Sequence, residues 1–203
     1  MRAVLWCNGS IPSQRVIEST ISDGDKIFGV DGGADKALEC GFQVMQAIGD
    51  MDSIEAKNWD GGLSRISDQS CSDLVKSISF LIDGGFTEIE VIGIDGGSQS
   101  HILGNWAALC EAPGGALIRL HHEEYVTHRI HPMDGKFEME MGLESKFSIF
   151  ALEPGMVWLK GAKWEISGEV LSFSTRGLNN EGMGKVVSIK SESVLAIVMQ
   201  RLS

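Results

Sequence analysis

The sequence predicts an α/β plus all-β chain: an N-terminal, mostly parallel α/β/α sheet domain followed by a C-terminal β-sandwich or β-barrel domain. In the first 121 residues, short apolar strands alternate with helical stripes, as expected for a parallel sheet covered on both faces. After residue 121, short strand-like segments follow one another without a convincing helix. The length of 203 residues fits one ordinary domain or two small ones. We therefore expect domains at residues 1–121 and 122–203.

In the first domain, apolar or alternating runs predict strands, and all but the last are followed by Gly, Asp or Asn. These runs are residues 3–7, 26–30, 44–48, 88–94 and 116–120. Helices are expected between them, at residues 12–21, 34–40, 72–82 and 102–110. Pro12 suits a first helical turn. Ser72 is a plausible N-cap and Asp73 a first-turn acid for the third helix.

In the second domain, seven short segments have strand character. They are residues 126–130, 136–141, 147–151, 156–160, 170–173, 186–190 and 194–199. Turn signals such as Met133-Asp134-Gly135 and Glu153-Pro154-Gly155 separate them.

Composition excludes several classes of protein. The net charge of −11 leaves no broad basic surface for a polyphosphate chain, so no nucleic-acid partner is expected. The four cysteines have no CxxC spacing, which indicates free thiols rather than a zinc or redox site. No segment has the length of a signal sequence core or a membrane span. We expect a cytoplasmic protein with no membrane partner.

The acids are unevenly distributed, because 11 of the 12 Asp lie at or before Asp95. Four Asp-bearing loops follow strands or lead into a helix: Asp31-Gly32-Gly33, Asp50-Met51-Asp52, residues 68–73, and Asp95-Gly96-Gly97. Ligands of open α/β sheets bind beyond the carboxyl ends of the strands. Converging Asp carboxylates suit Mg²⁺, and paired glycines let the main chain approach a phosphate. Any one Asp-Gly loop could be a plain turn, but four at one sheet edge favour a ligand site.

Other polar and aromatic residues leave alternatives open. The dinucleotide-binding and P-loop glycine motifs are both absent. His101 opens a helix after Gly96-Gly97, so it could either meet a phosphate or cap that helix. His121, His122, His128 and His131 are expected on strand faces rather than at a metal. Trp164 could lie in the β core or offer its ring to a cation.

In order along the chain, the loops resemble the motifs of the thiamine pyrophosphokinase family. The resemblance rests on Asn8-Gly9, Asp31-Gly32-Gly33-Ala34, Gly49-Asp50-Met51-Asp52-Ser53-Ile54, Asp68-Gln69 with Ser72-Asp73 and Lys76, and Gly96-Gly97 with His101 and Asn105. In the second domain it rests on Lys160-Gly161-Ala162-Lys163-Trp164 and residues 174–181. It covers nearly the whole chain.

This resemblance implies transfer of a diphosphoryl group from ATP to the hydroxyl of thiamine, with Mg²⁺, giving thiamine diphosphate and AMP. It implies that Asp50, Asp52 and Asp73 are the catalytic residues and hold the metal. The nucleotide would be bound by Asn8, Asp31, Gly32, Gly33, Asp68, Gln69, Gly96, Gly97, His101 and Asn105. Thiamine would be bound by Trp164, Ser174, Thr175, Asn179 and Asn180. It also implies a homodimer with thiamine bound between the α/β domain of one chain and the β domain of the other.

The fourth loop departs from the family pattern. Ser98 and Ser100 stand where the family usually has Arg and Asp, and Ser cannot supply the bidentate phosphate contact of Arg. Asn179 also stands where Ser is common. Two alternatives therefore accompany the main hypothesis. One is a related diphosphokinase acting on another hydroxymethyl heterocycle, such as a pterin. The other is a catalytically degenerate protein that binds thiamine or a nucleotide.

Overall fold

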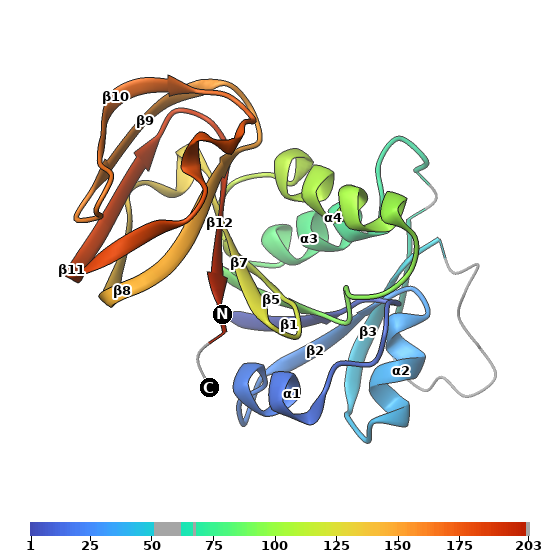
Figure 1. Cartoon of the computed structure of the whole chain (residues 1–203). Helices are drawn as coiled ribbons and strands as arrows, with labels where there is room; N and C mark the ends of the chain where they lie inside the picture. Colours follow the sequence, from blue (N-terminus) through green and yellow to red (C-terminus); the bar gives the residue numbers. More distant parts are fainter. Residues whose placement is uncertain (51–61, 67, 202–203) are drawn as a thin grey trace. The chain divides into compact units, whose positions relative to one another are not determined.

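The computed structural model describes residues 1–50, 62–66 and 68–201. The fold is of the mixed α/β type, rich in sheet, and divides into two compact units, Met1–Glu123 and Glu124–Ser203 (Figure 1). The boundary lies two residues after the position predicted from the sequence.

In its described residues, the first unit is built on a parallel sheet of six strands in the order β6-β5-β1-β2-β3-β4. The strands are β1 (Arg2–Trp6), β2 (Lys26–Val30), β3 (Val44–Gly49), β4 (Gly62–Arg65), β5 (Glu88–Ile92) and β6 (Leu117–His121). The helices are α1 (Gln14–Thr20), α2 (Gly33–Glu39), α3 (Asp73–Asp83) and α4 (Gln99–Glu111). Figure 1 shows α1 and α2 on one face of the sheet and α3 and α4 on the other.

The predicted strands and helices of this unit are confirmed, with three corrections. Strand β4 was not predicted, because its sequence Gly-Leu-Ser-Arg has no strand pattern. Pro12 does not lie in the first turn of α1: Ser13 is the N-cap, and its hydroxyl accepts a hydrogen bond from the Val16 amide. Helix α4 begins at Gln99, three residues before the expected start, because the polar residues that follow Ser98 already form helical turns.

The second unit is antiparallel, with strand order β10-β9-β11-β8-β12-β7. The strands are β7 (Tyr125–Ile130), β8 (Phe137–Ala151), β9 (Gly155–Lys160), β10 (Ile166–Leu171), β11 (Asn180–Ser191) and β12 (Leu195–Gln200). Short 3₁₀ turns η2 (Pro132–Asp134) and η3 (Thr175–Gly177) connect some of them. The prediction of separate strands at 136–141 and 147–151 was wrong, because both segments belong to β8. That strand pairs first with β11 and then with β12.

Each unit has a hydrophobic core of its own. In the first, Trp6 and Val4 of β1 pack with Val16 of α1 and with Ala34 and Ala37 of α2. In the second, side chains of all six strands meet. Its buried members include Ile130, Ile149, Leu159, Ile166, Ile189 and Ile197. The sheet of the first unit is therefore anchored on a packed face, which fixes the positions of the loops at its strand ends.

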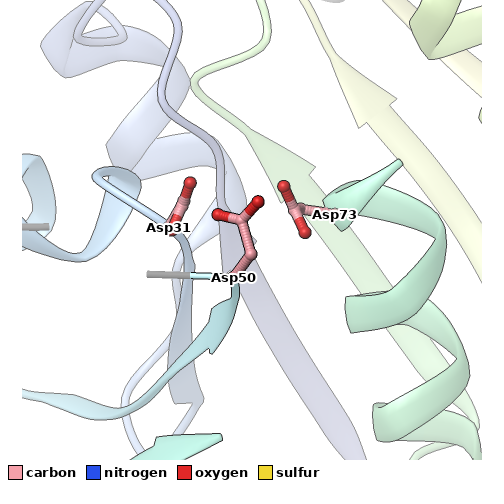
Figure 2. A group of neighbouring side chains, drawn as sticks. All are labelled: Asp31, Asp50 and Asp73. Atoms are coloured by element: carbon pink, nitrogen blue, oxygen red, sulfur yellow. The ribbon is translucent and has the colours of Figure 1, made fainter. Parts of the chain in front are cut away.

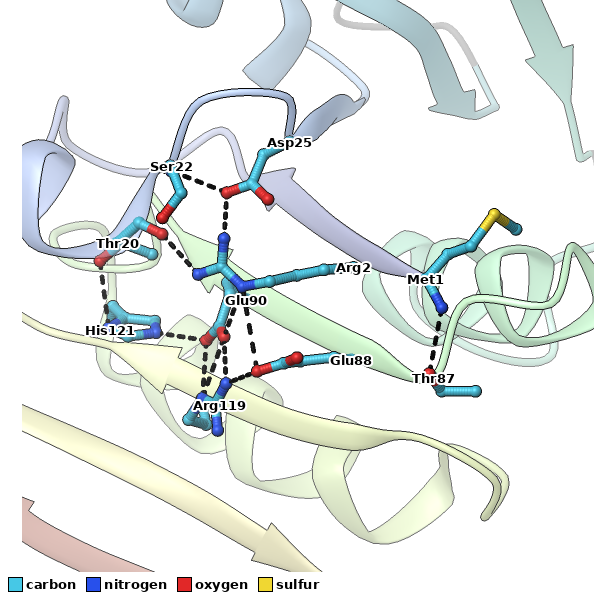
Figure 3. Close-up of polar contacts among 10 residues, drawn as sticks. All are labelled: Met1, Arg2, Thr20, Ser22, Asp25, Thr87, Glu88, Glu90, Arg119 and His121. Atoms are coloured by element: carbon cyan, nitrogen blue, oxygen red, sulfur yellow. Dashed lines mark hydrogen bonds and ion pairs between the residues drawn. The ribbon is translucent and has the colours of Figure 1, made fainter.

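A buried charge network ties the sheet of the first unit to α1 (Figure 3). Glu90 of β5, 1% exposed, accepts hydrogen bonds from Arg2 of β1 and Arg119 of β6, and pairs with His121 at 2.7 Å. The other ring nitrogen of His121 lies 3.2 Å from the Thr20 hydroxyl of α1. Burial raises the pKa of the Glu90 carboxyl, but hydrogen bonds from His121 and Arg119 outweigh burial and hold that pKa at about 2.

Candidate functional site

Three carboxylates meet at the carboxyl edge of the parallel sheet. Asp31 follows β2, Asp50 follows β3, and Asp73 is the first residue of α3. One oxygen of each lies within 4.8 Å of the others, and Figure 2 shows the three side chains pointing toward one another. We call Asp31, Asp50 and Asp73 the carboxylate trio. Asp52, predicted as its companion, lies outside the described residues.

The backbone around Asp31 holds this residue in an unusual conformation. Its φ is +50°, and its amide donates to the Ile48 carbonyl of the neighbouring strand at 3.0 Å. A Cβ on Gly49 would lie 3.1 Å from the Asp31 carboxylate, and the φ of Gly49 is +154°. The glycine that precedes Asp50 therefore lets the carboxylate of Asp31 lie against β3, which brings the two acids together.

A buried lysine accompanies the trio. Lys76, one turn into α3, is 6% exposed, and its Nζ lies 2.9 Å from Oδ1 of Asp73. The hydrogen bond to Asp73 raises the pKa of Lys76 against the opposing effect of burial, and the charge of Asp50 adds to the increase. Lys76 is thus a fixed positive charge beside three acids. The sequence had placed Lys76 in a motif without a role.

Two residues of the loop before α3, Asp68 and Gln69, were predicted to bind the nucleotide, and only Gln69 contacts the trio in the described residues. Gln69 Nε2 donates to Oδ2 of Asp50 at 3.2 Å. Asp68 instead accepts from the amide and hydroxyl of Ser70 at 2.9 and 2.8 Å, and is not a member of the trio. These two bonds lower the pKa of the Asp68 carboxyl, the backbone one most. Asp68 therefore shapes the loop.

A cavity of about 510 Å³ adjoins the trio, since Val30 and Leu74, the sequence neighbours of Asp31 and Asp73, both line it. We call it the loop cavity. Its other lining residues are Cys7, Asn8, Gly9, Ser10, Lys36, Gly93, Ile94, Gly96, Gly97, His101 and Asn105. Five residues predicted for the nucleotide are among them: Asn8, Gly96, Gly97, His101 and Asn105. Lys36 was missed by the sequence reasoning.

The first glycine pair has a packing role. Gly32 is the N-cap of α2, and a Cβ on Gly33 would lie 2.1 Å from the Trp6 carbonyl oxygen. Helix α2 therefore begins in direct contact with the end of β1. Neither Gly32 nor Gly33 is among the residues that line the loop cavity.

The Asp95 carboxylate does not join the trio, although Gly96 and Gly97 of the same loop line the loop cavity. Its carboxylate pairs with His122 Nδ1 at 2.6 Å and accepts from the Glu123 amide at 2.9 Å. Asp95 therefore links the loop after β5 to the residues that follow β6.

His101 and Asn105 of α4 both reach the loop cavity. His101 Nδ1 accepts from the Ser98 amide at 3.4 Å, which is the capping alternative left open by the sequence. Asn105 Nδ2 donates to the Ile94 carbonyl at 3.3 Å and holds the end of the β5 loop. The capping bond and the position in the cavity are both present for His101.

The second unit carries a pocket of about 310 Å³. It is lined by Trp164, Arg176, Gly177, Leu178, Asn179 and Asn180, and we call it the tryptophan pocket. Of the five predicted thiamine residues, Trp164, Asn179 and Asn180 line it. Ser174 and Thr175 are not among the lining residues, although Thr175 begins the adjacent turn η3.

Asn180 fixes the position of the tryptophan. Its buried side chain accepts from the Trp164 amide at 3.2 Å and donates to the Trp164 carbonyl at 2.8 Å. The Trp164 side chain itself is 53% exposed, so the core alternative is wrong. Lys163 Nζ lies 4.7 Å from its ring centroid, in cation–π range, and is also paired with Glu181 at 2.7 Å.

Comparison with known families identifies the first unit. Residues 17–117 match the family model described as "Thiamin pyrophosphokinase, catalytic domain", a range that contains the whole carboxylate trio. The chain belongs to the thiamine pyrophosphokinase family. No curated protein matches the chain at a significant level.

Solved thiamine pyrophosphokinases share the fold. The Bacillus subtilis enzyme superposes with a TM-score of 0.78 at 19% identity, covering 98% of this chain and 99% of its own. The Geobacillus thermodenitrificans protein gives 0.77 at 19% identity, with coverage of 100% and 99%. The yeast enzyme gives 0.72 at 14% identity, with coverage of 98% and 86%. Family membership makes the chain a kinase-like enzyme whose family uses ATP and thiamine.

None of the helices in the described residues is long and apolar enough to cross a membrane.

Proposed function

We propose that this thiamine pyrophosphokinase family member transfers the terminal diphosphoryl group of ATP to the hydroxyl of thiamine, releasing AMP. The observation that carries the proposal is the carboxylate trio beside the loop cavity, within the range matched by the catalytic family model. Phosphoryl transfer depends chiefly on positioning and on neutralising charge. An acidic metal site next to a nucleotide-sized cavity supplies both.

The trio fits a divalent cation of the Mg²⁺ type. Its donors are carboxylate oxygens within 4.8 Å of one another, which suits a hard cation that also binds phosphate oxygens. We propose Asp31, Asp50 and Asp73 as ligands, with Asp52 as a further one. When bound, such an ion neutralises charge on the phosphates and aligns them for displacement.

The protein's own side chains have the other roles. Lys76 holds Asp73 in place and offsets one of the three negative charges. Gln69 orients the carboxylate of Asp50. Asn8, Gly96, Gly97, His101 and Asn105 bound the space that the nucleotide would occupy.

We assign the acceptor to the tryptophan pocket. The ring of Trp164 is 53% exposed, and an aromatic face attracts cations, so we propose that it contacts the thiazolium ring of thiamine. Asn179 and Asn180 supply amides at the same pocket, although the Asn180 side chain is committed to the Trp164 backbone. We propose a homodimer in the cytoplasm as the working form, which sedimentation of the purified protein tests.

The decisive experiment incubates the protein with ATP, thiamine and Mg²⁺ and measures thiamine diphosphate and AMP. Asp50→Asn should abolish product formation. Asp83→Asn, at the exposed far end of α3, is the matched control and should keep it. Full activity in Asp50→Asn would refute the metal assignment.

Two other results would redirect the proposal. AMP release with a different hydroxymethyl heterocycle, such as a pterin, and not with thiamine, would identify a related diphosphokinase. Binding of thiamine or nucleotide in calorimetry without any product would identify a degenerate binding protein. In that case Ser98→Arg with Ser100→Asp should restore turnover.

A further inference from the structure

We infer that Lys36 is the polyphosphate-recognising side chain of the loop cavity, an inference that rests on the proposed use of ATP. Of the described residues that line the cavity, Lys36 is the only Lys or Arg, and none is Asp or Glu. The cavity adjoins the trio, whose carboxylates repel an anionic ligand unless a cation neutralises the ligand's charge. A fixed cation in its wall therefore has a direct electrostatic use.

The position of Lys36 follows from the packing of α2. Because Gly33 touches the Trp6 carbonyl, the helix lies directly on the end of β1. One turn later, Lys36 Nζ reaches the chain that continues from β1. It donates to the Asn8 carbonyl at 2.7 Å and to the Gly9 carbonyl. An ammonium has three donors, so one remains for a ligand oxygen.

Two backbone amides of the same loop are already engaged and are not available to a phosphate. The Gly9 amide donates to the Gly93 carbonyl at 2.7 Å, and the Ser10 amide donates to the Asp95 carbonyl at 2.6 Å. Residues 8–9 thus present carbonyl oxygens toward Lys36, which would repel a phosphate. On this side of the cavity, Lys36 turns an acceptor-rich loop into a site with a charged donor.

The competing explanation is that Lys36 only ties the loop down. The two roles differ in which ligands they affect. A loop tie supports the whole cavity, so its loss should weaken every ligand equally. A phosphate contact supports only ligands with phosphates, and its loss should spare adenosine.

Nucleotide affinity of the full chain with Mg²⁺ therefore tests the inference, with adenosine, AMP, ADP, ATP and inorganic pyrophosphate as separate probes. Lys36→Gln keeps a donor for the loop carbonyls but removes the charge. This substitution should lower the affinity for ATP, ADP and pyrophosphate roughly ten- to hundredfold, because a charge-assisted bond is lost. The affinity for adenosine should not change. Lys36→Arg should retain most of the affinity. Lys26→Met is the control and should match the unaltered protein, because Lys26 begins β2 at the end away from Asp31.

Three results would overturn the inference. These are unchanged ATP affinity in Lys36→Gln, an equal loss for adenosine and ATP, and the absence of any adenine nucleotide or pyrophosphate binding by the unaltered protein. If ATP binding behaves as expected but no thiamine diphosphate forms, the proposed function fails and the assignment of Lys36 stands.

Discussion

Neutralising Asp50 should stabilise the metal-free protein while abolishing its response to Mg²⁺. Oxygens of the trio lie within 4.8 Å of one another. At that separation, two charges repel by about 0.9 kcal/mol in the dielectric of water, and by more in a less polar setting. Asp50→Asn removes two of the three repulsive pairs and keeps an oxygen for the bond from Gln69.

Because the site is only partly buried and Lys76 already offsets some repulsion, we expect a gain of about 1–2 kcal/mol in the free energy of unfolding. For a chain of this size, that raises the melting temperature by roughly 2–8 °C. The unaltered protein should instead gain from the metal, by about 1.4 kcal/mol at ten times its dissociation constant.

Urea unfolding in EDTA and in Mg²⁺ measures both effects. Asp50→Asn should exceed the unaltered protein in EDTA and respond little to Mg²⁺, and Asp83→Asn should behave like the unaltered protein in both. A variant that is less stable in EDTA and still stabilised by Mg²⁺ would refute the reasoning, because the trio would then be neither repulsive nor a metal site.

Three further predictions concern Lys76 beside the trio, Glu90 in the buried charge network, and Asn180 beside Trp164. Lys76→Met should lower the free energy of unfolding, measured by urea unfolding, by about 1–3 kcal/mol, because the hydrogen bond to Asp73 is lost. The pKa of Glu90 falls from 4.5 to about 2 on folding, so its stabilisation is complete above pH 4.5 and disappears as the pH falls to 2. Acid titration of stability should therefore show about 3 kcal/mol less pH dependence in Glu90→Gln, and an unchanged curve would contradict this. Asn180→Ala should raise the KM for thiamine, measured with ATP saturating, because the Trp164 backbone loses both of its bonds to that side chain; an unchanged KM would exclude the clamp.

The acids of the trio could be predicted because their placement depends on local sequence. Asp31 and Asp50 each follow an apolar run, and Asp73 follows an N-cap serine, so a parallel sheet brings the three to one edge. Nothing local distinguishes Asp95, which also follows a strand. Its partner is His122, 27 residues later, and only the path of the chain after β6 brings the two together.

Lys36 and β8 escaped prediction for related reasons. A lysine in a short helix is ordinarily solvated, and only the contact of Gly33 with Trp6 brings this one to Asn8. In β8, residues 142–146 lie between the two predicted strands and have no strand pattern, and Glu144 has a φ of +61°. The strand continues because β11 supplies partners on both sides of that residue, including Met183 opposite Leu143. Pairing between distant segments outweighed the local signal.

The charge arrangement of the first unit reconciles an acidic protein with an anionic substrate. The net charge of −11 opposes the approach of ATP, and the trio adds local repulsion. Two lysines oppose this at short range. Lys76 is buried against Asp73, and Lys36 lies in the cavity wall with a donor for the ligand. Lys76 is already paired with Asp73, so among the described residues that line the cavity Lys36 is the lysine that can contribute its charge to the ligand. Neutralising Lys36 should therefore weaken the binding of phosphates selectively. Raising the ionic strength should therefore weaken ATP binding more in the unaltered protein than in Lys36→Gln, which calorimetry at two salt concentrations checks.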